Sequence, residues 1–156
     1  MRAVIQRVKS ASVTVDSKVV SSIGKGLLVL VGVGQEDTEA DCDELASKVV
    51  KMRLWPDENG QWKKSVRDIE GEVLCVSQFT LFANIKKGAK PDFHRAAKGP
   101  DAKGLYEKVL DKIGSGLPNG RESVHDGVFG AMMDVSLVND GPVTIELDTK
   151  KGKVSI

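Results

Sequence analysis

The sequence predicts a single α+β domain over residues 1–156, with a mostly antiparallel sheet forming a barrel-like core and about two helices packed outside it. Three observations support this fold class. Short apolar segments rich in β-branched residues lie at both ends of the chain, segments with helical spacing lie between them, and no repeat or linker divides the sequence. A chain of 156 residues with 40% apolar composition can also bury its own core.

The amino-terminal part of the chain is predicted to form four strands. They cover residues 2–8, 11–15, 18–23 and 27–33, which are rich in valine, leucine and isoleucine. Short turns are expected at Asp16-Ser17 and at Gly24-Lys25-Gly26. These strands supply one half of the predicted sheet.

Two helices are predicted in the middle of the chain. The first begins at Thr38, because Asp41 completes a capping pattern, and it should end near Trp55, before Pro56. The second covers residues 101–113, where apolar residues recur at every fourth position before a glycine. In the first helix the apolar face consists of Cys42, Leu45, Val49 and Met52.

Two later segments place small polar groups where an apolar strand ends or bends. Ser77-Gln78-Phe79-Thr80 follows the apolar run at residues 73–76, which has the composition of a buried strand. Asn139-Asp140-Gly141-Pro142-Val143-Thr144 interrupts another apolar run. A Gly-Pro step between strands has little packing value, so we expect the two segments to be halves of one site. They can meet within one chain or across two.

These segments also carry a resemblance. The chain is similar to D-aminoacyl-tRNA deacylases of the D-tyrosyl-tRNA deacylase family, which have an SQFT segment and a later NxGPxT segment. Further similarity covers residues 1–8, 24–29, 90–94 and 129–131. The resemblance implies hydrolysis of the ester bond of D-aminoacyl-tRNA, and of mischarged glycyl-tRNA, as proofreading in translation. It also implies a cytoplasmic homodimer without a cofactor.

The resemblance further implies how the substrate is selected. In the family, a Gly-cis-Pro step binds the substrate α-ammonium through its carbonyls, excludes the L-enantiomer, and enters the active site of the partner subunit. Glycine lacks a Cβ, so the same step also admits a glycyl ester. The residues implied in substrate binding and chiral selection are therefore Gly141, Pro142, Arg7, Phe129, Met133 and Val143.

The catalytic segment is expected to be Ser77, Gln78, Phe79 and Thr80. A Ser or Thr nucleophile needs a base within hydrogen-bond reach, and nothing in the sequence ties either histidine to Thr80. In an extended strand the two hydroxyls would also face opposite sides, unless the chain bends or bulges. We therefore expect main-chain N–H groups near Phe79 and Thr80 to stabilise the oxyanion, with water attacking and the ribose hydroxyl assisting.

A basic segment is the candidate tRNA-binding surface. The net charge of +1 argues neither for nor against a nucleic acid, but cations cluster around an aromatic ring between residues 86 and 103. A solvated face is the alternative interpretation of such a cluster. The expected tRNA-binding residues are Lys86, Lys87, Lys90, Phe93, His94 and Arg95.

Other classes of function find little support. Cys42 and Cys75 lack a C-x-x-C pattern and are expected to be reduced and buried, while no motif predicts a metal or a nucleotide cofactor. No apolar stretch is long enough for a membrane span, and the amino terminus is unlike a signal peptide, so a cytoplasmic protein is expected. Two rival functions remain: a non-catalytic nucleic-acid-binding module of the same fold, and a relative directed at L-aminoacyl or peptide substrates.

Overall fold

A mixed six-stranded sheet forms the centre of the structure, a computed structural model that describes residues 1–150. The last residues of the predicted domain, 151–156, lie outside this described part. The strand order is β2-β1-β3-β6-β7, and β8 pairs with β1 off this path. The strands are β1 (Arg2–Val15), β2 (Lys18–Ile23), β3 (Gly26–Gly32), β6 (Glu72–Ser77), β7 (Val124–Asp126) and β8 (Asp134–Asp148).

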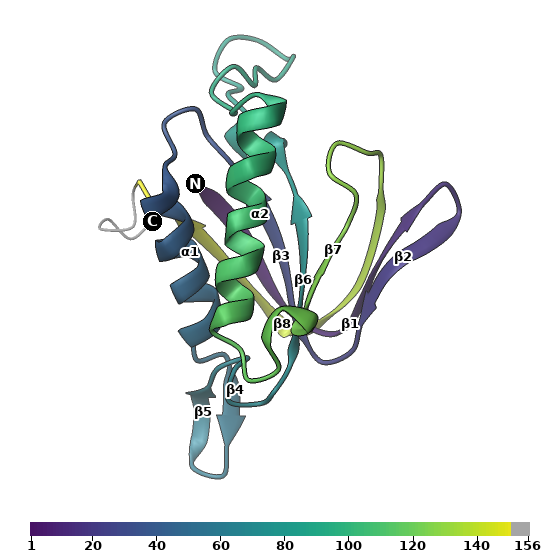
Figure 1. The fold of residues 1–156 in the computed structure, drawn as a ribbon, viewed down its shortest axis with the longest axis vertical. Coiled ribbons are helices and arrows are strands. Elements are labelled where there is room, and N and C mark those ends of the chain that lie inside the picture. The colour runs from purple at the N-terminus through teal and green to yellow at the C-terminus, as the bar shows by residue number, and fades with distance from the viewer. Residues whose placement is uncertain (151–156) are drawn as a thin grey trace.

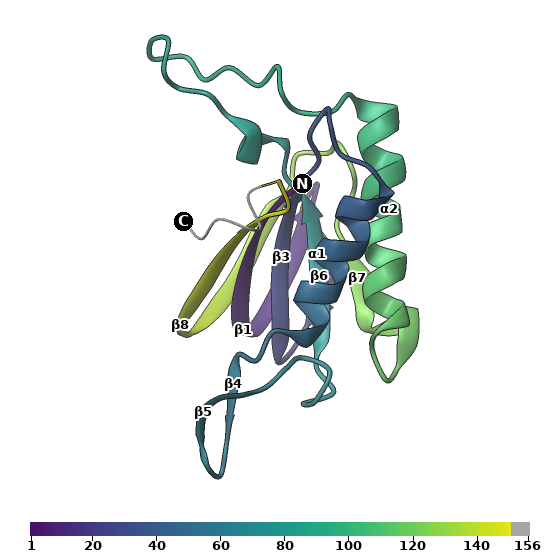
Figure 2. The ribbon, with the colours of Figure 1, turned by 90° about the vertical axis from the view of Figure 1, so that its left-hand side faces the viewer.

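The predicted fold class is confirmed. All pairs made by β1 are antiparallel, whereas β6 pairs in parallel with β3 and with β7. Two helices, α1 (Glu39–Lys51) and α2 (Gly99–Ser115), lie side by side on one face of the sheet (Figure 2). The sheet itself bends towards a barrel (Figure 1).

Two apolar clusters hold the sheet, one on each face. Between sheet and helices, Ile5 and Val29 pack in one cluster with Leu45 of α1 and Tyr106 of α2, all fully buried or nearly so. The opposite face buries a second cluster around Leu74. Burial of a side chain of this size contributes roughly 1.5–3 kcal/mol, so the two clusters fix the ends of β6 and β3 that carry the site.

The bend in the sheet arises within β1 and β8. Residues 2–8 of β1 pair with β3, and residues 11–15 pair with β2, while β8 accompanies both halves. The sequence predicted two separate strands here, but β1 runs through the predicted break. Register shifts around Val8 absorb the irregularity, and bulges of this kind bend and twist a strand without ending it.

The first helix ends earlier than predicted. Its start is as expected, because the Thr38 N–H donates to the Asp41 carboxylate at 2.8 Å. Its end is at Lys51, since Leu54 N–H bonds to Lys64 O at 2.9 Å and begins a hairpin of β4 (Trp55–Asp57) and β5 (Gly60–Lys64). Buried Trp55 thus belongs to the hairpin rather than to the helix. The second helix exceeds its predicted range by two residues at each end.

The two cysteines are free and buried, as predicted. Burial raises the pKa of the Cys75 thiol on β6 and of the Cys42 thiol on α1. Among residues 1–150, no helix has the length and apolar character needed to cross a membrane.

Candidate active site

The chain turns sharply at the end of β6. Ser77 is the last strand residue, and Phe79–Phe82 form a 3-10 turn, η1. Of the two conformations considered for residues 77–80, extended or bent, the structure has the bent one, because the chain leaves the sheet once the Gln78 N–H has bonded to Val31 O at 2.7 Å. The side chains of residues 77–80 therefore do not alternate between two faces of a strand, which was the arrangement that would have separated the hydroxyls of Ser77 and Thr80.

An apolar cavity of about 340 Å³ lies beside this turn. Ser77, Gln78 and Phe79 line it together with the predicted Phe129 and Met133. Thr80 is exposed and outside the lining, although its hydroxyl accepts a hydrogen bond from the Gln78 amide. The remaining lining residues are small or apolar: Val31, Val33, Ala97, Gly99, Ala102, Gly130, Ala131 and Met132.

Two main-chain amides are free at the start of the 3-10 turn. The N–H groups of Gln78 and Leu81 are occupied, by Val31 O and by Gln78 O respectively. By contrast, the N–H groups of Phe79 and Thr80 have no hydrogen-bond partner among residues 1–150. The first amides of a helical turn are unpaired for geometric reasons, and such pairs can stabilise an oxyanion.

Neither histidine lines the cavity. His94 pairs with Asp92 in an exposed loop, and His125 Nε2 lies 2.6 Å from Glu72, at the start of β6 and away from Ser77. Within residues 1–150, no group of three or more His, Cys, Asp and Glu side chains is arranged to hold a metal ion.

The second segment forms a bulge in β8 rather than a turn between two strands. Gln6 pairs with Thr144, and Val8 with Asn139, so Arg7 alone faces residues 140–143. The Gly141–Pro142 peptide bond is cis, and both residues are exposed.

Two side chains hold this bulge in place. The Arg7 guanidinium is buried and donates to Asp140 O at 3.1 Å and to Leu54 O of the segment before β4. The Asn139 side chain accepts from the Val143 N–H at 2.8 Å and donates back to Val143 O at 3.3 Å. Arg7 thus holds the bulge in place, and so does Asn139, which the sequence marked as part of the segment but not for this role.

The two segments do not meet within one chain. Ser77 pairs with Val31, whereas Arg7, which holds the bulge, pairs with Leu27 at the other end of β3 (Figure 1). Four residues along a strand correspond to about 13 Å, and the three strand spacings from β6 to β8 add about 14 Å across the sheet. Phe129 and Met133 are therefore beside the catalytic segment, while Arg7, Pro142 and Val143 are not.

A partly buried hydrogen bond supports the wall of the cavity. The Tyr106 hydroxyl on α2 donates to the Asp126 carboxylate, and the ring of Tyr106 lies 5.8 Å from that of Phe129. Burial raises the pKa of Asp126, although the bonds from Tyr106 and from the Gly127 N–H oppose this. No sequence signal distinguished Tyr106 from an ordinary core residue, because it lies within the apolar stripe of α2.

The basic segment adjoins the cavity through two aromatic rings. Phe93 meets the half-exposed Phe79 edge to face, with ring centroids 5.1 Å apart. The loop that carries the lysines projects from the body of the molecule (Figure 2). Its predicted tRNA-binding cations are all exposed: Lys86, Lys87, Lys90, His94 and Arg95.

Comparisons with known proteins agree with this arrangement. The family described as D-Tyr-tRNA(Tyr) deacylase matches residues 4–148. A D-aminoacyl-tRNA deacylase of Yarrowia lipolytica is 68% identical over 98% of this chain and 100% of its own length. One of Aquifex aeolicus is 53% identical over 97% of this chain and 99% of its own.

Solved structures share the same fold. A protein named "c-Myc DNA Unwinding Element Binding Protein" superposes with a TM-score of 0.89 at 46% identity, over 96% of this chain and 99% of that one. A second structure, described as a probable eukaryotic D-amino acid tRNA deacylase, has a TM-score of 0.76 over 94% of this chain and 97% of that one; at 16% identity it supports the fold alone. From the family match and the close relatives, this chain belongs to the D-Tyr-tRNA(Tyr) deacylase family.

Proposed function

We propose that this protein hydrolyses the ester bond of D-aminoacyl-tRNA and releases the free D-amino acid and the tRNA. Family membership supports the reaction class. The observation that carries the proposal is the pair of free amides, Phe79 and Thr80, beside an apolar cavity. As a proofreading factor in translation, the protein would act in the cytoplasm.

The reaction needs little more than electrostatic stabilisation. The α-ammonium of the substrate withdraws electrons, so the ester carbonyl is already activated towards water. As water adds, negative charge develops on the carbonyl oxygen, and the N–H groups of Phe79 and Thr80 stabilise it. One such donor is worth about 10²–10³ in rate. The intermediate then expels the ribose oxygen, which takes up the proton that the attacking water loses, and the neighbouring ribose hydroxyl assists by relaying this proton.

The Gly141–Pro142 bulge completes the cavity of a second subunit. Within one chain the bulge and the cavity are too far apart to bind the same aminoacyl group. The bulge is exposed, and Arg7 and Asn139 hold it, which suits an element that enters a partner. In the resulting homodimer, the bulge would exclude an L-side chain and admit D-residues and glycine.

A comparison of three substrates tests this function. One tRNA is charged with D-tyrosine, L-tyrosine or glycine, and release of each amino acid by the purified protein is followed. We expect rapid release of D-tyrosine, release of glycine, and survival of the L-tyrosyl ester. Equal rates for D- and L-tyrosyl-tRNA would overturn the proposal.

A second candidate function is nucleic-acid binding without catalysis. The solved structure at 46% identity carries a name that refers to a DNA element, and the exposed cations at residues 86–95 would suffice for such binding. A pure binder would protect or ignore the ester, so D-tyrosyl-tRNA would decay no faster with the protein than without it.

A further inference from the structure

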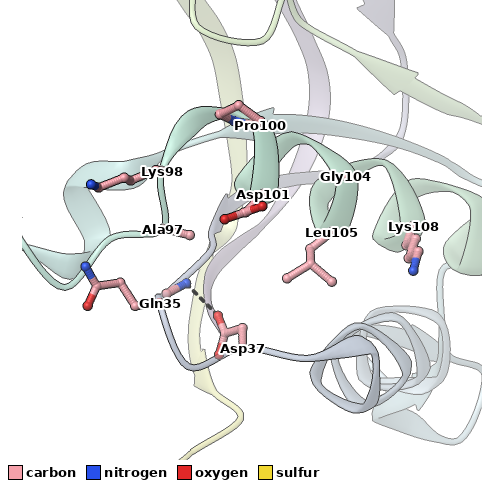
Figure 3. Close-up of a pocket in the computed structure, with 10 residues that line it drawn as sticks. Gln35, Asp37, Ala97, Lys98, Pro100, Asp101, Gly104, Leu105 and Lys108 are labelled. Carbon is pink, nitrogen blue, oxygen red and sulfur yellow. Dashed lines mark hydrogen bonds between the residues drawn. The ribbon is translucent and has the colours of Figure 1, made fainter.

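A second hollow adjoins the apolar cavity. Its volume is about 630 Å³, and it lies between the segment after β3, with Gly34 and Asp37, and the start of α2 (Figure 3). Ala97 lines both hollows, so they lie next to each other at this residue. A hollow of this size accommodates a ligand as large as a nucleotide.

Two lysines of the second hollow are available to phosphates. Figure 3 shows Lys98 and Lys108 at opposite ends of it. Lys98 has no carboxylate within 4.0 Å in the described part of the chain. Lys108 lies 3.4 Å from Glu39, but this pair is exposed and Lys112 binds the same carboxylate at 3.4 Å. Exposed pairs of this kind are weak, so Lys108 can exchange its partner.

The two carboxylates that line the hollow, Asp37 and Asp101, differ in whether they already have hydrogen-bond partners. Asp37 is buried and already accepts from the Gly34 N–H and the Met1 ammonium, both at 2.6 Å. Asp101, in the first turn of α2, is exposed and makes no such pair among residues 1–150. A free carboxylate between cations repels phosphate but accepts well from the N4 amino group of cytosine.

We propose that this hollow binds the penultimate nucleotide of the tRNA, a cytidine in the single-stranded CCA end. Lys98 and Lys108 contact the phosphates on either side of it, and Asp101 accepts from the cytosine N4. This inference rests on the proposed function, because the terminal adenosine must occupy the adjoining cavity. Because Ala97 lines both hollows, they lie side by side, as the sites of two successive nucleotides must.

The test compares two substrates that differ only beyond the terminal adenosine. D-Tyrosyl-tRNA carries the cytidine, whereas D-tyrosyl-adenosine does not. The double variant Lys98→Ala/Lys108→Ala should raise KM for D-tyrosyl-tRNA about tenfold or more and leave kcat unchanged. It should hydrolyse D-tyrosyl-adenosine like the wild type. The dependence of log(kcat/KM) on log[salt] should also become shallower by about 1.4, since each single-strand phosphate contact accounts for about 0.7.

Two controls make the test specific. Lys48→Ala removes a positive charge from an exposed position of the neighbouring helix α1, outside the hollow, so its KM should stay near that of the wild type. Replacing the penultimate cytosine by uracil should cost the wild type roughly tenfold in kcat/KM and cost Asp101→Ala much less.

Three results would be adverse. A wild-type KM in the double variant, or an equal loss on both substrates, would overturn the nucleotide site while leaving the deacylase function intact. A wild-type protein that hydrolyses neither substrate would overturn the proposed function as well.

Discussion

Replacing Gly141 by alanine should disrupt chiral selection, and the structure gives the size of the perturbation. Gly141 has a φ of +129°, a region that is essentially restricted to glycine and costs other residues about 1–3 kcal/mol. A Cβ there would lie 2.9 Å from Val143 Cγ2 and 3.1 Å from Arg7 Nη2. Such crowding adds roughly 1–3 kcal/mol. Because the bulge is exposed, we expect it to shift rather than to retain this strain.

Gly60→Ala is a matched control. Gly60 has a nearly equal φ of +135°, but nothing lies within 4 Å of the Cβ it would gain. Both variants therefore carry the backbone cost, and only Gly141→Ala carries the contact with Arg7 and Val143. The difference in activity between the two variants therefore reports the effect of displacing the bulge.

The assay is hydrolysis of D- and L-tyrosyl-tRNA, with thermal denaturation to verify folding. Gly60→Ala should keep the wild-type ratio of D to L rates. Gly141→Ala should lose about 100-fold in the D rate and lower that ratio, since misplacing a positioning group by 1 Å can cost this much. If Gly141→Ala, folded, retains both within twofold, the bulge has no part in substrate selection.

Two further predictions concern Thr80 and Asp41. Thr80→Ala keeps the free amides and removes only a hydroxyl outside the cavity, so deacylation should stay within tenfold of wild type; a loss of 10³-fold or more would assign the hydroxyl a catalytic role. Burial raises the pKa of Asp41, but bonds from Thr149, the Thr38 N–H and Lys150 outweigh this and lower it to about 2, from 3.8. At 1.36 kcal/mol per pKa unit, the ionised carboxylate contributes on the order of 2 kcal/mol above pH 5, and the contribution is lost as the pH falls towards 2. In urea unfolding, Asp41→Asn should therefore be less stable at pH 7 and approach the wild type in acid; a gap that does not change with pH would contradict the assignment.

Periodicity predicted the regular elements because it reports local burial. The apolar stripe of α2 and the strands around the central β3 follow from spacing alone. The β4–β5 hairpin was missed although Asn59-Gly60, a strong turn signal, lies where the loop ends and β5 begins. Because buried Trp55 continues the apolar spacing of the preceding helix, the spacing did not indicate that a strand begins there.

The site depends on tertiary contacts that no local pattern encodes. The turn at Phe79 follows from where β6 leaves the sheet, and the hydrogen bond from Arg7 to Leu54 O requires β1, β8 and the hairpin to be assembled. The sequence therefore indicated which segments matter, but not that the fold holds them apart.

A mixed-subunit experiment tests most directly whether two chains share each site. Gly141→Ala damages the bulge, and Ala131→Trp fills the cavity, which Ala131 lines. Each variant alone should hydrolyse D-tyrosyl-tRNA about 100-fold more slowly than the wild type, or slower still. A heterodimer of the two, isolated through two different tags, pairs one intact cavity with one intact bulge, and should recover about half the wild-type rate on D-tyrosyl-tRNA. A heterodimer as inactive as its parents would contradict the shared site.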